Sequence, residues 1–82
     1  MNLIKKENDL IYLNLLYEIH IAKDKIDCFS KKYNQDFKSF SEYVNNLSQE
    51  DFEVWDDFLE WKAYEQSLLE SQKQVENLNG NN

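Results

Sequence analysis

The sequence predicts an all-α protein: a long antiparallel helical hairpin, with helices over about 3–33 and 49–76 and a short connecting helix over about 37–46. Proline is absent and glycine occurs once, whereas β-sheet proteins draw heavily on both for tight turns. The length of 82 residues allows one small domain. We expect that domain to cover 1–76 and to be followed by a flexible polar tail over 77–82.

The first helix is predicted by a heptad pattern in which apolar side chains recur on one side of the chain in steps of four and three. Alternation at every second residue between 13 and 21 would also suit a strand, but turn residues do not flank it. Lys31 and Lys32 favour a helix end, and Asn34 suits a left-handed cap. The pattern consists of Ile4, Ile11, Leu15, Ile19, Ala22, Ile26, Phe29 and Tyr33.

A second apolar stripe follows the same helix, about 130° around its axis from the first. One packed neighbour cannot cover both stripes. We therefore expect the first half of this helix to contact its hairpin partner on one side and a second body on the other. The second stripe consists of Leu3, Leu10, Tyr17, Ile21 and Cys28, with Leu13 beside it.

The two later helices are predicted from their capping residues. Asp36 suits the N-cap of the short helix, because its carboxylate can accept hydrogen bonds from free backbone N–H groups. A capping box formed by Ser39 and Glu42 is the alternative and would start this helix later. Ser48 is the predicted cap of the third helix, whose first turn is acidic.

The segment 52–64 carries more apolar surface than one helix contact requires. Its aromatic and aliphatic side chains cover about half of the helical wheel, and acidic side chains fill much of the rest. We expect Phe58 and Leu59 to face the core. Trp55 and Trp61 lie at opposite edges of the apolar arc, a position typical of aromatic residues that anchor interfaces.

Composition excludes several classes of function. The net charge is −7 and all nine basic residues are lysine, which argues against direct binding of nucleic acid. The single cysteine fits a reducing compartment, so we expect a cytoplasmic protein. The longest apolar run, 10–22, is too short and too polar to span a bilayer, so no membrane partner is expected.

Signals for catalysis are weak. Glu53, Asp57 and Glu60 share one helix face, but no histidine or second acidic motif joins them. His20 and Cys28 each stand alone, and no glycine-rich phosphate loop exists. We expect no enzyme activity, no cofactor and no metal site.

Two blocks of sequence resemble small antitoxin-like proteins that are encoded beside a toxin in bacterial and archaeal two-gene toxin–antitoxin pairs. The first is Phe29-Ser-Lys-Lys-Tyr-Asn-Gln-Asp-Phe-Lys-Ser-Phe40, and the second is Phe52-Glu-Val-Trp-Asp-Asp-Phe-Leu-Glu-Trp-Lys-Ala63. The resemblance covers 29–64, and its most distinctive piece is Glu60-Trp61-x-Ala63. The sequence departs from the family pattern at Asn34, where glycine is usual, and at Lys38 and Ser39, where acids are usual.

The resemblance implies that the protein binds a cognate, nuclease-like toxin and blocks it. An acidic chain with excess apolar surface is suited to such a basic partner. We expect a homodimer or a complex with the toxin; the alternative is a structural helical homo-oligomer without a toxin partner. The predicted partner-binding residues are Leu10, Leu13, Tyr17, Ile21, Trp55, Asp57, Glu60, Trp61 and Tyr64.

Overall fold

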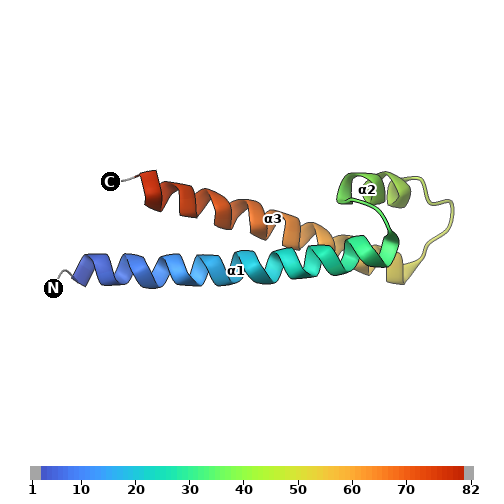
Figure 1. Cartoon of the computed structure of the whole chain (residues 1–82). Helices are drawn as coiled ribbons and strands as arrows, with labels where there is room; N and C mark the ends of the chain where they lie inside the picture. Colours follow the sequence, from blue (N-terminus) through green and yellow to red (C-terminus); the bar gives the residue numbers. More distant parts are fainter. Residues whose placement is uncertain (1–2, 81–82) are drawn as a thin grey trace.

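The structure is a computed structural model that describes residues 3–80, with side chains described from residue 8 onward. It contains α1 (Leu3–Tyr33), α2 (Phe37–Asn45) and α3 (Phe52–Gly80). The helices α1 and α3 run antiparallel, and α2 lies beside α3 near the end where the chain turns (Figure 1). The prediction of an all-α helical hairpin is confirmed. We call the turning end the closed end and the end near both termini the open end.

From Leu15 onward, the helix α1 presents its predicted heptad face to α3; Ile11 is 47% exposed, and the side chain of Ile4 lies outside the described residues. Leu15 and Ala22 are buried on this face, and the later positions, from Ile26 onward, pack against the core of the closed end. The helix ends at Tyr33 because Asn34 takes the predicted left-handed conformation, with φ of 53°. The segment 13–21 is helical, so its alternating pattern does not mark a strand.

The short helix α2 begins at its predicted cap. The Asp36 carboxylate accepts a hydrogen bond of 2.8 Å from the Ser39 backbone N–H, which leaves a capping box at Ser39 unnecessary. At the other end, Asn46 donates its side-chain N–H to the Glu42 carbonyl at 2.8 Å. Both ends of this nine-residue helix are therefore closed by neighbouring side chains.

The helix α3 starts later and ends later than the sequence predicts. Its N-cap is Asp51, whose carboxylate accepts from the Val54 N–H at 3.2 Å, and Ser48 stays in the connection. The connection must extend this far because Leu47 turns back to pack against the core. The helix continues to Gly80, through most of the segment predicted as a polar tail, with Val75 and Leu78 half-buried.

The core lies at the closed end and centres on Trp61, which is 1% exposed. Its indole ring stacks on Phe29 of α1 at 5.7 Å between centroids and on Phe40 of α2 at 5.0 Å. Phe37 of α2 lies 5.4 Å away in a tilted arrangement. Aromatic pairs at such distances add to the free energy gained from burial. Trp61 therefore joins all three helices.

Two expectations about the α3 wheel are wrong. Trp61, expected at the rim of the apolar arc, is the centre of the core, and Leu59, expected in the core, is 58% exposed. The cause is the position of α2, which covers the edge of the arc that contains Trp61 and Val54. Phe58 packs against the core as expected.

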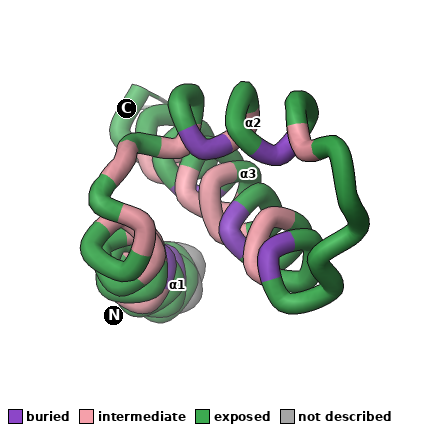
Figure 2. Tube along the Cα trace, turned by 90° about the vertical axis from the view of Figure 1, so that its right-hand side faces the viewer, coloured by how far each residue is buried: buried purple, intermediate pink, exposed green. Residues whose placement is uncertain are grey.

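Packing is uneven along the molecule, which measures 60 × 18 × 18 Å. Its radius of gyration is 16.8 Å, against about 12 Å for a compact chain of this length. Buried residues gather around α2 at the closed end (Figure 2). Toward the open end, where α2 does not reach, the buried residues with described side chains are Leu15, Ala22 and Ser71.

Replacing Trp61 with alanine should destabilise the protein severely. Removal of a buried aromatic ring costs about 3–5 kcal/mol, which approaches the whole free energy of unfolding of roughly 4–12 kcal/mol for a domain of this size. Urea unfolding followed by circular dichroism measures the loss. Phe52→Ala is the matched control, because Phe52 is 75% exposed and its removal should change stability little. Equal losses in the two variants would contradict this assignment of the core.

Candidate functional site

The predicted partner-binding residues separate into three places, of which the first is the outer face of α1. We use this name for Leu10, Leu13, Tyr17 and Ile21, which lie on the side of the helix turned away from α3. Leu10, Leu13 and Tyr17 are 56%, 60% and 63% exposed, and Ile21 is half-buried. The sequence predicted this second stripe. Leu3 belongs to it by pattern, but its side chain lies outside the described residues.

The second place is the closed-end surface, which we define as Phe52, Trp55 and Leu59 of α3. These side chains are 75%, 38% and 58% exposed. Trp55 was predicted as a contact residue, and Phe52 and Leu59 were missed. The helical wheel of 52–64 could have indicated their exposure. All three residues occupy one edge of the apolar arc, and a helix contact buries only part of an arc this wide.

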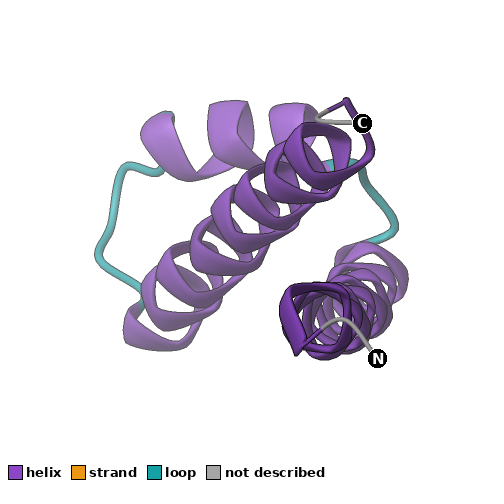
Figure 3. Cartoon of the chain, turned by 90° about the vertical axis from the view of Figure 1, so that its left-hand side faces the viewer, coloured by secondary structure: helices purple, strands orange, loops and turns teal. Residues whose placement is uncertain are grey.

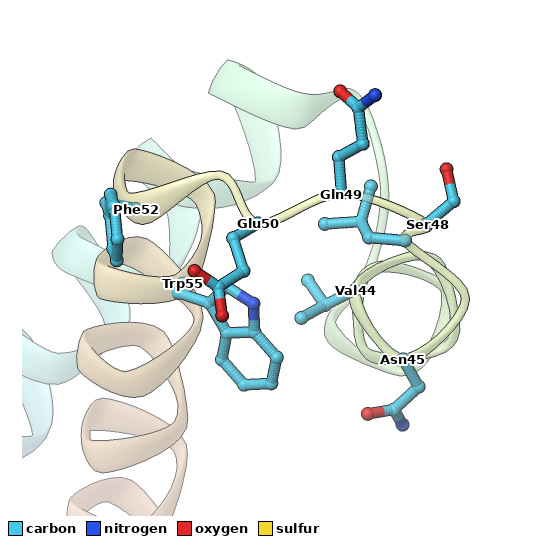
Figure 4. Close-up of a pocket in the computed structure, with 8 residues that line it drawn as sticks. Val44, Asn45, Ser48, Gln49, Glu50, Phe52 and Trp55 are labelled. Carbon is cyan, nitrogen blue, oxygen red and sulfur yellow. The ribbon is translucent and has the colours of Figure 1, made fainter.

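An open pocket of about 570 Å³ adjoins the closed-end surface. Figure 4 shows the Trp55 indole on one side and Val44 of α2 on the other, with the Glu50 side chain beside the indole. The pocket is thus partly apolar and carries a carboxylate at its edge. Its lining is completed by the end of α2, the connecting segment and the start of α3, namely Asn45, Leu47, Ser48, Gln49 and Phe52.

The third place is the interior contact between α1 and α3, which holds Asp57. The Lys32 ammonium donates to Asp57 at 2.6 Å and to Glu53 at 3.0 Å, and the Tyr33 hydroxyl also donates to Asp57. The Asp57 side chain is only 14% exposed. Asp57 thus links the two long helices in this structure, and its predicted role in partner binding stays a prediction.

Ionisation at this link follows from its geometry. Burial disfavours the Asp57 carboxylate, but hydrogen bonds from Lys32 and Tyr33 outweigh that effect and lower the Asp57 pKa. Burial and the hydrogen bond to Asp57 raise the pKa of Tyr33 to about 12. The pKa of Lys32 is also raised, chiefly by its hydrogen bonds to Asp57 and Glu53. The charged carboxylate, the ammonium and the neutral phenol therefore stabilise one another.

The remaining predicted residues differ in their access to a partner. Trp61 is buried in the core, with its indole N–H donating to Glu65 at 3.2 Å, and offers no surface in this conformation. Tyr64 is half-buried, and Glu60 is exposed. Of the distinctive pair Glu60-Trp61, only the glutamate is accessible.

The two exposed apolar surfaces lie at different levels of the hairpin. The Lys32–Asp57 contact of 2.6 Å and the Ser71–Glu18 hydrogen bond of 3.3 Å fix the register of α1 against α3. At a rise of about 1.5 Å per residue, the levels of Tyr17 and Trp55 are about 25 Å apart along the axis. A small partner bound at one surface would leave the other uncovered.

A metal site, a reactive cysteine or histidine, or a membrane span would each leave a recognisable arrangement of residues. Among the side chains of residues 8–80, no three His, Cys, Asp or Glu gather as they would around a metal ion. His20 pairs with Asp24 at 3.4 Å on the surface of α1, and Cys28 is an exposed free thiol. None of the three helices, over the part that is described, has the length and apolar character needed to cross a membrane.

Comparison of the chain with protein-family models, with curated proteins and with solved structures returned no match. The resemblance to antitoxin-like proteins therefore stays a prediction from the two sequence blocks.

Removing the Asp57 carboxylate should weaken the contact between the long helices. We expect Asp57→Asn to lower the free energy of unfolding by about 1–3 kcal/mol, the usual range for hydrogen bonds to a charged group. Chemical denaturation at pH 7 measures the change. Asp27→Asn is the control, since Asp27 pairs with Lys31 on the surface at 2.9 Å, where an ion pair contributes about 0–1 kcal/mol.

The same variant should flatten the acid dependence of stability. Because the folded-state pKa of Asp57 is lowered, its contribution is present above the ordinary pKa of about 4 and is lost as the pH falls below it. The pKa of Asp36 is lowered by the hydrogen bond from the Ser39 backbone, so Asp36 contributes equally to the acid dependence of stability in both proteins. Parallel stability curves for wild type and Asp57→Asn between pH 6 and about pH 2 would contradict the assignment.

Proposed function

We propose that the protein is a binding module that neutralises a basic, nuclease-like toxin by direct contact through the closed-end surface. The observation that carries this proposal is the combination of exposed aromatic side chains with unneutralised acids at one end of a rigid core. Protein interfaces are typically anchored by such aromatic residues at their centre. The resemblance to antitoxin-like proteins covers 29–64, the part of the chain that builds this end.

The charges of the closed end support a basic partner. Between residues 50 and 60 the sequence holds six acids and no base. Lys32 from α1 engages Glu53 and Asp57, the two acids that face it. The acids left at the surface are Glu50, Asp51, Asp56 and Glu60, all of which are exposed.

The proposed mechanism is steric and electrostatic occlusion. Exposed acids raise the association rate of a basic partner, and the aromatic side chains lower its dissociation rate by excluding water from the contact. An enzyme that handles nucleic acid needs a basic surface for phosphate, which an acidic module can cover. The proposed place of action is the cytoplasm, where Cys28 stays reduced.

The gene next to the coding sequence supplies the test of this function. Its product should be a basic protein that inhibits growth, and co-expression of the present chain should restore growth and co-purify a complex. Growth inhibition that persists although both proteins are folded and abundant would exclude the proposed role. A complex that forms without rescue would also contradict it, because binding would then not block activity.

Substitutions at the closed end should weaken this complex. Phe52→Ala removes the most exposed aromatic side chain and should raise the dissociation constant by about tenfold or more, as measured by calorimetry. Glu60→Lys should mainly slow association, with a smaller effect in high salt. Glu76→Lys makes the same charge change on an exposed residue near the open end and is the control. Similar losses from both lysine variants would place the interface elsewhere.

A further inference from the structure

The outer face of α1 is left uncovered by the fold. Between residues 10 and 17 the chain carries no charged side chain, and seven of these eight residues are leucine, isoleucine or tyrosine. Leu15 alone of this run is buried. The end-on view from the termini shows α1 beside α3, with α2 across α3 (Figure 3). A water-exposed run of this kind is costly unless another surface covers it.

We propose that a second copy of this chain covers the outer face of α1, with the two α1 helices packed antiparallel about a two-fold axis near residues 15–16. Pairing by level then places Leu10 opposite Ile21 of the other copy and brings Leu13 to within about 2 Å of the level of Tyr17. Each of the four side chains meets an apolar one, so the face is complementary to itself, as an isologous interface requires. The product is a row of four long helices with the α1 pair in the middle.

Charge favours a second copy over the basic partner proposed for the closed end. Two chains of net charge −7 repel one another, so self-association needs a surface that is free of acids. Leu10, Leu13, Tyr17 and Ile21 are all uncharged, and the next acid along this side of α1, Asp24, lies one turn beyond Ile21 and pairs with His20 at 3.4 Å. A basic toxin would gain no electrostatic attraction from this face, whereas the closed end offers it four exposed acids.

The exposed apolar area of the outer face suits a dimer of moderate affinity. The four side chains expose about 400 Å² per copy, taking roughly 200 Å² for a large side chain that is fully accessible. A standard interface buries about 800 Å² per partner and surrounds an apolar centre with a polar rim. Asn14 and His20 lie beside the four residues, Asp24 and Cys28 continue the same side of α1 beyond Ile21, and these exposed side chains would form that rim.

The mass of the full chain in solution tests the proposal directly. Sedimentation equilibrium at about 100 μM should give close to twice the 9.9 kDa of one chain, because a dimer with a dissociation constant of about 1 μM or below is mostly associated at this concentration. A monomer at this concentration overturns the proposal. The proposed toxin is absent from this measurement, so its outcome does not depend on the function assigned to the closed end.

Substitutions locate the interface. Tyr17→Glu places a charge at the centre of the stripe and should weaken the dimer by at least about tenfold. Helicity should be retained, because this side chain is 63% exposed. Leu59→Glu makes a similar change at an equally exposed leucine of α3 and should leave the dimer unchanged. A dimer that survives Tyr17→Glu, or is lost in Leu59→Glu, would contradict the assigned face.

Cross-linking fixes the orientation. With the axis near residues 15–16, the two Cys28 thiols would be about 37 Å apart along the helices, whereas two cysteines at position 14 would be about 5 Å apart. A short bis-maleimide should therefore link Asn14→Cys chains in a Cys28→Ala background and leave wild type unlinked. Linking of wild type through Cys28 would indicate a parallel pair and overturn the antiparallel arrangement.

Discussion

The packing of the Trp61 indole against rings from two other helices is the interaction on which the rest of the structure depends. Phe29 reaches it from α1, and Phe37 and Phe40 reach it from α2. These ring contacts hold α2 against α3. Because α2 occupies one side of α3, the Trp55 edge of the apolar arc is turned outward. The exposed aromatic surface of the closed end is thus a consequence of how the core is filled.

The sequence was sufficient for the elements that local chemistry decides. The bounds of α1 and the start of α2 followed from the heptad pattern, the left-handed Asn34 and the Asp36 cap. The start of α3 did not, because Ser48 and Asp51 are both good caps and the packing of Leu47 decides between them. Local preference predicts that a helix begins, whereas tertiary contact selects the residue at which it begins.

The exposure of the candidate residues was predicted where it depends on one helix and missed where it depends on two. The exposed stripe of Leu10, Leu13 and Tyr17 can be read from α1 alone. The contact of Asp57 with Lys32 depends on the register of α1 against α3. The burial of Trp61 and the exposure of Leu59, the reverse of what was expected, depend on the position of α2. A helical wheel shows how wide an apolar arc is, but it does not show which part a neighbour will cover.

The uneven packing has a consequence for how the hairpin opens. Its buried side chains crowd the closed end, whereas toward the termini the helices are joined chiefly by Leu15, Ala22 and the Ser71–Glu18 hydrogen bond. Free energies of local opening follow such differences in contact density. The backbone amides around Trp61 should exchange with solvent only when the whole molecule unfolds, while those near the termini exchange through partial separation of α1 from α3. The two long helices would then separate first at the open end, with the aromatic core at the closed end as the hinge.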